Sequence, residues 1–171
     1  MIKIENVTKR FDGYAALDHF SLTVPKGAIY GLMGLNGAGK TTTFYMIVGI
    51  ERPDAGVVTL DGKDISNMPM YERARAGIGY LPQEASLFSK MTVEDNIMAI
   101  LETTDMDAEA REQKMNDLIE EFRLGHVRKS EGKALSGGER RRVEIARALA
   151  TNPAFISVPY KQLKLPTNKH V

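Results

Sequence analysis

The chain has 171 residues, a length that suits one domain whose folding buries about 70% of the surface of the unfolded chain. Its 23 basic and 22 acidic residues leave a net charge of +1, and it has no cysteine, so its composition favours neither nucleic acid nor a membrane surface and excludes disulfides and thiolate zinc sites. No apolar run approaches the ~18 residues of a membrane-spanning helix, so we expect a soluble protein that inserts no segment into a membrane.

Three short β-rich stretches open the chain, and each predicts a strand: "IKIENV", "FSLTV" and "AIYGLM". The third stretch runs directly into a glycine-rich loop. A helix is predicted after this loop, in "KTTTFYMIVGI". Its expected apolar face consists of Phe44, Ile47, Val48 and either Tyr45 or Ile50.

The middle of the chain predicts a hairpin and then a change to helices. "GVVTLDGKDI" is typical of a β-hairpin that turns at Asp61-Gly62, and "ERARAGIGYLPQ" predicts a short helix, a strand and a loop. From Thr92 to Arg123 the apolar period is helical, with Asp107 as the N-cap of a second helix. "SGGERRRVEIARALATNP" predicts a further helix, and "AFISV" begins a last strand.

The loop "GLNGAGKT" matches the phosphate-binding pattern G-x-x-x-x-G-K-[ST]. Its glycines let successive backbone N–H groups converge on phosphate oxygens at a helix start, where the helix dipole is positive. Lys40 adds a positive charge for the β and γ phosphates, and the Thr41 hydroxyl is placed for Mg²⁺. A glycine-rich turn without a ligand is the alternative. The candidate nucleotide-binding residues here are Gly34, Leu35, Asn36, Gly37, Ala38, Gly39, Lys40, Thr41 and Thr42.

A second candidate anion site lies in "LSGGE", from Leu135 to Glu139. A capping box explains Ser136 and Glu139, since a serine at the N-cap and a glutamate three residues later satisfy each other's backbone N–H groups. It does not explain Gly137 and Gly138, each of which costs about 1 kcal/mol relative to alanine inside a helix. Bare backbone at a helix start is what a phosphate group needs, so both glycines indicate a ligand.

These motifs resemble those of the ATP-binding subunits of ABC transporters: "GLNGAGKTT" is similar to Walker A, "YLPQ" to the Q-loop and "LSGGERRRVEIARAL" to the signature. The resemblance covers residues 1 to about 156. It implies an α/β P-loop NTPase fold with a RecA-like core, an N-terminal antiparallel β portion and a helical subdomain, incomplete at the C-terminus. The expected single domain has its core at about 1–84 and 135–156, the helical subdomain at about 85–134 and a non-family tail at about 157–171.

The resemblance also implies roles for individual residues. ATP and Mg²⁺ are the implied ligands, with Phe11 stacked on adenine, Tyr14 as its competitor, and Gln83 joining Thr41 at the metal. Two subunits would enclose two ATP molecules, as a homodimer or a dimer with an intact subunit. Each signature would then serve the other subunit's nucleotide, through Leu135, Ser136, Gly137, Gly138 and Glu139.

The implied partners are membrane subunits that dock in a groove near Glu84–Phe88, with the chain held at the cytoplasmic face of a bacterial inner membrane. Within the family, "RARAGIGYLPQEASLF" is most similar to the members that serve lipopolysaccharide export. Transport of another substrate, such as a branched-chain amino acid, is the alternative. Nucleic acid is not an expected partner, because the basic residues form no stripe.

The catalytic acids of the family have no counterpart in this sequence. After Glu144 the chain contains no aspartate or glutamate, so the metal-binding aspartate and the catalytic glutamate are absent, and His170 lies too early for the switch histidine. Loss of a general base typically lowers a rate 10²–10⁴-fold, so we expect ATP binding with little or no hydrolysis. The alternatives are a non-catalytic ATP-binding fragment and an unstable fragment. We expect a disordered tail and a change of reading frame near Ile156, which sequencing the gene would test.

Overall fold

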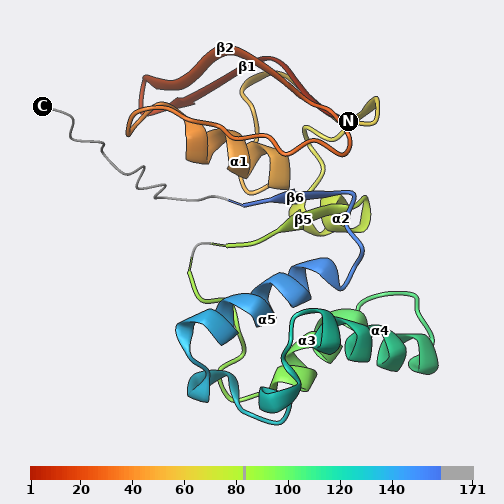
Figure 1. Cartoon of the computed structure of the whole chain (residues 1–171). Coiled ribbons are helices and arrows are strands. Elements are labelled where there is room, and N and C mark those ends of the chain that lie inside the picture. Colours follow the sequence, from red (N-terminus) through yellow and green to blue (C-terminus); the bar gives the residue numbers. More distant parts are fainter. Residues whose placement is uncertain (83, 159–171) are drawn as a thin grey trace, which may run out of the picture.

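The computed structural model describes residues 1–82 and 84–158, so the predictions for Gln83 and for the tail beyond Val158 lie outside the described residues. Figure 1 shows two lobes, one built around a four-stranded sheet and one of helices, with a small parallel sheet between them. The structure thus has the mixed α/β architecture expected from the sequence.

The four-stranded sheet is antiparallel and has the strand order β2-β1-β3-β4. Its strands are β1 (Ile2–Phe11), β2 (Tyr14–Val24), β3 (Ala55–Leu60) and β4 (Lys63–Asp64). Asp61 and Gly62 join β3 to β4 with positive φ angles of 48° and 85°, the geometry of a two-residue hairpin turn. The predicted first two strands and the predicted hairpin are therefore confirmed.

The third predicted strand, "AIYGLM", was wrong. Residues 28–35 form no regular element, and the side chains of Ile29, Met33 and Leu35 are almost fully exposed. Apolar residues with high β propensity form a strand only where another strand offers free backbone N–H and C=O groups alongside. No strand within the described ranges pairs with this segment.

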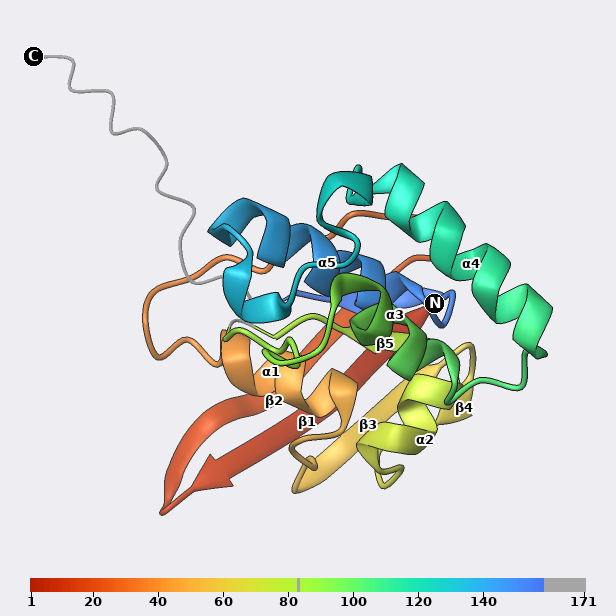
Figure 2. The same cartoon turned by 90° about the horizontal axis from the view of Figure 1, so that it is seen from below.

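Helix α1 (Lys40–Val48) lies between the four-stranded sheet and the parallel pair β5 (Ile78–Tyr80) and β6 (Phe155–Ser157), as Figures 1 and 2 show. Its buried face differs from the predicted one, since Phe44 and Tyr45 are only half-buried and Ile50 is exposed. Ile47 and Val48 are buried as predicted, and Thr43 and Met46 take the other buried positions.

Helix α2 (Met70–Arg75) places Arg73 completely inside the first lobe. The guanidinium group of Arg73 donates to the carbonyl oxygens of Met68 at 2.7 Å, Ser66 at 3.0 Å and Ile47 at 3.1 Å, and also to that of Met46. Met46 and Ile47 belong to the last turn of α1, whose carbonyl groups have no partner within the helix. Burial lowers the pKa of Arg73 to about 10, which leaves the side chain charged at neutral pH.

The second lobe consists of α3 (Val93–Leu101), α4 (Ala108–Glu121) and α5 (Gly137–Leu149), with two short 3₁₀ helices, η1 (Gly125–Val127) and η2 (Gly132–Ala134). Asp107 caps α4 as predicted, and Thr92 caps α3; each accepts from the backbone N–H three residues later. The predicted helices are confirmed. Within the described part of the chain, no helix is both long and apolar enough to span a membrane.

The buried apolar residues form two clusters, one in each lobe. Leu135, Val143 and Ala146 are buried in the helical cluster. Phe155 instead packs against the first cluster. The apolar residues of α5 therefore pack in the second lobe, where α5 contacts α3.

Candidate functional site

The phosphate loop occupies residues 34–39, directly before α1, and two of its glycines have left-handed backbone conformations. Gly39 is the N-cap of α1 with φ 77°. A Cβ atom at Gly39 would lie 2.5 Å from the carbonyl oxygen of Ala16, so only glycine fits. This contact fixes the end of the loop, and with it the start of α1, against β2.

Lys40 folds back across the loop that precedes it. Its Nζ atom donates to the carbonyl oxygens of Gly34 and Leu35, both at 2.7 Å, so its charge lies over the loop. Helix α1 begins without a side-chain cap and has no acidic residue in its first turn. The first N–H groups of a helix have no partner within it, so this uncapped start and the Lys40 charge suit an anion such as a phosphate.

Thr41 is exposed at the start of α1, where its hydroxyl can reach a metal ion bound to the phosphates. Mg²⁺ usually takes few protein ligands and keeps waters and substrate phosphates for the rest. Within residues 1–82 and 84–158 there is no group of three or more His, Cys, Asp or Glu side chains that could hold a metal alone. The described residues therefore fit Mg²⁺ that arrives with a nucleotide. Gln83, the other predicted metal ligand, is not among them.

Two aromatic side chains stand at the tip of the β1-β2 hairpin, where Phe11 pairs with Tyr14. Phe11 is 42% exposed and Tyr14 is 66% exposed. Ala16, which contacts Gly39, is two residues from Tyr14, or about 7 Å along the strand. Both rings are exposed, and the strand that carries Tyr14 contacts the end of the phosphate loop at Ala16. Lys9 Nζ lies 5.1 Å from the centre of the Phe11 ring.

The second motif forms the start of α5 and contains the predicted capping box. Ser136 Oγ accepts from the N–H of Glu139 at 3.3 Å, and the N–H of Ser136 donates to Glu139 Oε2 at 2.9 Å. Leu135 is buried just before the helix. A Cβ atom at Gly137 or Gly138 would meet no atom within 4 Å, so packing within the described chain does not require either glycine. This bare backbone at the helix start is open to an approaching group.

The capping box is expected to depend on pH, because hydrogen bonds from Ser136 and His126 lower the pKa of Glu139 from 4.5 to about 2. A carboxylate with a lowered pKa stabilises the fold above its unfolded pKa and loses that contribution as the pH falls. We expect Ser136→Ala to lower the free energy of unfolding by about 1 kcal/mol at pH 7. Urea denaturation should show this difference shrinking between pH 4.5 and pH 2. A difference that stays constant over this range would contradict the role of Glu139.

The segment before α3 is tied to α5 by three side chains on one face of that helix. Arg141 donates to the carbonyl oxygen of Pro82 at 3.1 Å, and Glu144 Oε1 accepts from the N–H of Ser86 at 3.1 Å. Arg147 donates to the carbonyl oxygen of Ser86, and its guanidinium lies 4.8 Å from the Phe88 ring. This clamp was not predicted; the one sequence feature it leaves is the spacing of three between Arg141, Glu144 and Arg147.

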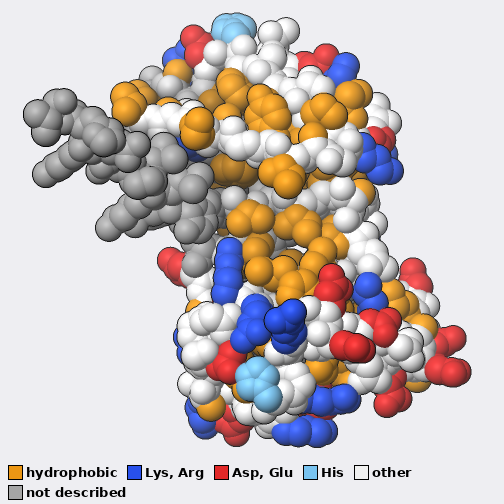
Figure 3. Space-filling model, viewed as in Figure 1, with side chains coloured by type: hydrophobic (Ala, Val, Ile, Leu, Met, Phe, Trp, Pro, Cys, Tyr) orange, Lys and Arg blue, Asp and Glu red, His pale blue; other side chains and the backbone are white. Residues whose placement is uncertain are grey.

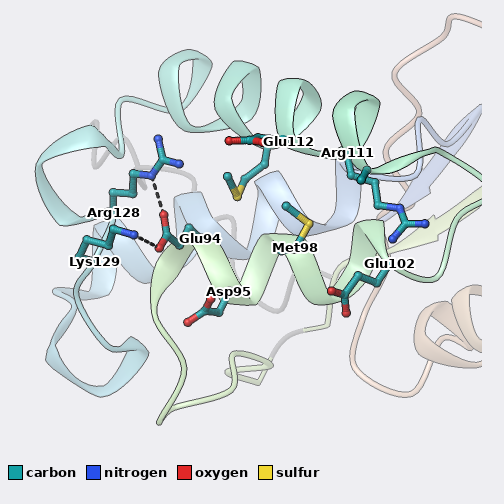
Figure 4. Close-up of a pocket in the computed structure, with 10 residues that line it drawn as sticks. Glu94, Asp95, Met98, Glu102, Arg111, Glu112, Arg128 and Lys129 are labelled. Carbon is teal, nitrogen blue, oxygen red and sulfur yellow. Dashed lines mark hydrogen bonds and ion pairs between the residues drawn. The ribbon is translucent and has the colours of Figure 1, made fainter.

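A groove of about 460 Å³ lies between α3 and α4. Figure 4 shows the acidic and basic side chains that line it. Glu94 Oε2 on α3 accepts a hydrogen bond from Arg128 Nε at 2.6 Å, and Glu94 also pairs with Lys129. Glu94 therefore connects α3 to the segment after η1. Hydrogen bonds from Arg128 and Lys129 lower the pKa of Glu94. Figure 3 shows that charged side chains gather on this helical lobe, whereas apolar side chains gather at the waist and on the other lobe.

A glycine-rich loop at the uncapped start of a helix, with a lysine folded over it in an α/β fold, defines a P-loop nucleotide-binding protein. Residues 17–158 match the ABC transporter family, and the chain belongs to that family.

Among curated proteins, the chain is similar to the lipopolysaccharide export system ATP-binding protein LptB of Escherichia coli K12. The two are 58% identical over 153 residues, which are 89% of this chain and 64% of LptB. LptB of Haemophilus influenzae is 55% identical over 157 residues, covering 91% of this chain and 65% of that protein. The chain thus spans less than two thirds of the length of these relatives.

Solved structures give the same fold. The ATP-binding cassette MJ1267 of an ABC transporter superposes with a TM-score of 0.80 at 32% identity, over 91% of this chain and 66% of that one. The ATP-binding cassette MJ0796, solved as a dimer bound to ADP and Pi, superposes with a TM-score of 0.77 at 29% identity, over 91% of this chain and 72% of its own.

Proposed function

We propose that the chain is the ATP-binding subunit of an ABC transporter that energises lipopolysaccharide export. The observation that carries this proposal is the phosphate loop at the uncapped start of α1, with Lys40 folded over it. The identity of 58% to LptB of Escherichia coli supports lipopolysaccharide as the transported substrate. Another ABC transport substrate is the alternative, and co-purification with lipopolysaccharide-export membrane subunits would separate the two.

In the proposed complex, the loop amides of residues 34–39 and Lys40 bind the phosphates of ATP. Lys40 would exchange its two backbone carbonyl partners for phosphate oxygens, since both bonds are to exposed loop residues. Thr41, together with Gln83, would hold Mg²⁺, which offsets the phosphate charge when it is bound. Phe11 or Tyr14 would stack on the adenine, because both exposed rings stand at the hairpin tip beside the loop.

A second subunit would complete the site. In Figure 1 the signature lies at the start of α5 in the helical lobe, away from the start of α1, so one chain does not bring both motifs to one phosphate. The open backbone at Gly137 and Gly138 suits a nucleotide held by another subunit. The dimeric cassette MJ0796 supports this arrangement. The partner would be a second copy or a full-length subunit.

The membrane subunits would dock at residues 84–88, where Phe88 is exposed and rests on Arg147. Hydrogen bonds from Arg141, Glu144 and Arg147 join this segment to α5, so a displacement of the segment by the membrane subunits would move the signature helix directly. The chain would then lie at the cytoplasmic face of a bacterial inner membrane. We also propose that the two apolar clusters are the cores of the nucleotide-binding unit and the helical subdomain.

We propose that this 171-residue chain binds ATP and hydrolyses it at least about 100-fold more slowly than full-length relatives, because residues 145–171 contain no carboxylate side chain. The test measures nucleotide affinity and phosphate release side by side on the purified chain. Turnover should rise on mixing with a full-length LptB whose own signature serine is replaced, since this chain supplies Ser136. Turnover by the chain alone at the rate of full-length LptB would overturn the proposal.

A further inference from the structure

The hydroxyl group of Ser136 is already engaged inside the chain. It donates its hydrogen to Glu139 Oε2 at 2.6 Å, while its oxygen accepts the N–H of Glu139. A serine hydroxyl has a single hydrogen to donate. While this bond to Glu139 holds, the hydroxyl cannot donate to a phosphate, so the state of Glu139 decides whether Ser136 is available to a nucleotide.

The other carboxylate oxygen of Glu139 is held by a histidine. His126 Nε2 lies 2.9 Å from Glu139 Oε1, so the two oxygens serve different partners, His126 on one side and Ser136 on the other. The imidazole of His126 is 60% exposed and the Glu139 side chain is 20% exposed. A proton from solvent therefore reaches the pair readily.

The backbone that carries His126 is fixed on both sides. Leu124 is completely buried, and Arg128 and Lys129 pair with Glu94, as Figure 4 shows. The carbonyl oxygen of Arg128 also accepts the N–H of Glu94 at 3.2 Å. His126 therefore reaches Glu139 from a rigid support on α3 and η1 rather than from a free loop.

The remaining charged groups at this junction are directed elsewhere. On α5, the Arg140 side chain donates to the carbonyl oxygen of Leu135 and that of Arg142 to the carbonyl oxygen of Phe122. On α3, Glu94 is taken up by Arg128 and Lys129. Among the described residues, His126 is the one side chain able to carry positive charge that pairs with Glu139.

We propose that His126 is a positioning residue of the signature helix: it holds Glu139 in the capping box and, when protonated, weakens the hold of Glu139 on the Ser136 hydroxyl. A carboxylate beside a phosphate site repels the phosphate, and an imidazolium on that carboxylate offsets the repulsion. The signature would then accept a nucleotide from a second subunit more readily at lower pH. This functional reading rests on the proposed function, whereas the positioning of Glu139 does not.

The positioning role is tested on the ¹⁵N-labelled full chain without nucleotide, by NMR from pH 5 to pH 8. In the unchanged protein, the Ser136 amide shift should change over this range of pH. His126→Leu should speed exchange of the Ser136 amide about two- to five-fold, the effect of losing one exposed charged pair. His126→Gln keeps a donor near the position of Nε2, so it should restore slow exchange but abolish the pH dependence.

His19→Leu is the matched control, because His19 forms a similar exposed pair with Asp18 at 2.9 Å on β2. This variant should leave the Ser136 amide unchanged. The proposal is overturned if His126→Leu leaves the exchange and the pH dependence of Ser136 unaltered, or if His126→Gln behaves like His126→Leu. Should His126→Leu fail to fold, the pH dependence in His126→Gln still decides the question.

The functional part is tested by sedimentation of the chain with Mg-ATP at pH 6 and pH 8. In the unchanged protein, ATP-dependent association should be tighter at pH 6 than at pH 8. In His126→Gln, association should not depend on pH. The monomers of the two proteins should bind the nucleotide with equal affinity. Association that is equally pH-dependent in both proteins would overturn the regulatory role. If the chain binds no nucleotide, the proposed function fails, and the amide measurement still decides the role of His126.

Discussion

Lys40→Ala is expected to weaken binding of Mg-ATP about 30- to 150-fold. The lysine would make charge-assisted hydrogen bonds to phosphate oxygens, each worth about 1.5–3 kcal/mol, and a loss of 2–3 kcal/mol corresponds to this range of affinity. The nucleotide-free chain also uses Lys40 to bridge the carbonyl groups of Gly34 and Leu35, so the substitution loosens the loop as well. Both effects act in the same direction.

Titration calorimetry with ATP and Mg²⁺ measures this affinity directly. Lys63→Ala is a suitable control, because Lys63 is exposed on the β3-β4 hairpin. This variant should bind ATP as the unchanged chain does. A melting curve of each variant separates a binding defect from unfolding. Unchanged affinity in Lys40→Ala would contradict the phosphate site itself.

Arg73→Met is expected to lower the free energy of unfolding by about 3–4 kcal/mol, a large share of the 5–15 kcal/mol typical of a domain. Methionine fills much of the volume but leaves the buried carbonyl groups of Ser66, Met46 and Ile47 without their donor. An unsatisfied buried polar group costs about 1–3 kcal/mol. The substitution therefore affects the end of α1 and its junction with α2 together.

Urea denaturation at pH 7 measures this loss. Arg75→Met, two residues further along α2, is the matched control, because Arg75 is exposed and its loss should change the free energy of unfolding by less than about 0.5 kcal/mol. Equal stabilities of the two variants would show that the buried guanidinium contributes nothing to the fold.

Most elements were predictable because their signals are local. The cap at Asp107, the Asp61-Gly62 turn and the capping box at Ser136 each depend on a few neighbouring residues. The strand expected at residues 28–33 failed because strand formation depends on a partner strand, which the segment itself does not specify. The buried face of α1 was predicted only in part: Ile47 and Val48 are buried as expected, but the other buried positions depend on tertiary packing that the segment itself does not specify.

The candidate site likewise has parts that local sequence predicts and parts that depend on distant residues. The phosphate loop could be predicted from its pattern, and the structure places it at the start of α1 as expected. Glu144 and Arg147 reach residues 58 and 61 positions earlier in the chain, and the sequence carries no signal for such distant pairs. The role of Arg73 was equally hidden, because its acceptors are backbone carbonyl groups that any residue would supply.

Helix α1 is fastened at both ends: Gly39 rests on β2 at its start, and Arg73 grips the carbonyl groups of its last turn. A ligand at the loop therefore cannot tilt this nine-residue helix without breaking either the contact of Gly39 with β2 or the hydrogen bonds of Arg73. The chain enters the helical lobe after β5 ends at Tyr80 and leaves it before β6 begins at Phe155. If a nucleotide causes the helical lobe to rotate, the rotation should therefore occur at these two strands, and the four-stranded sheet and α1 should move together as one rigid unit.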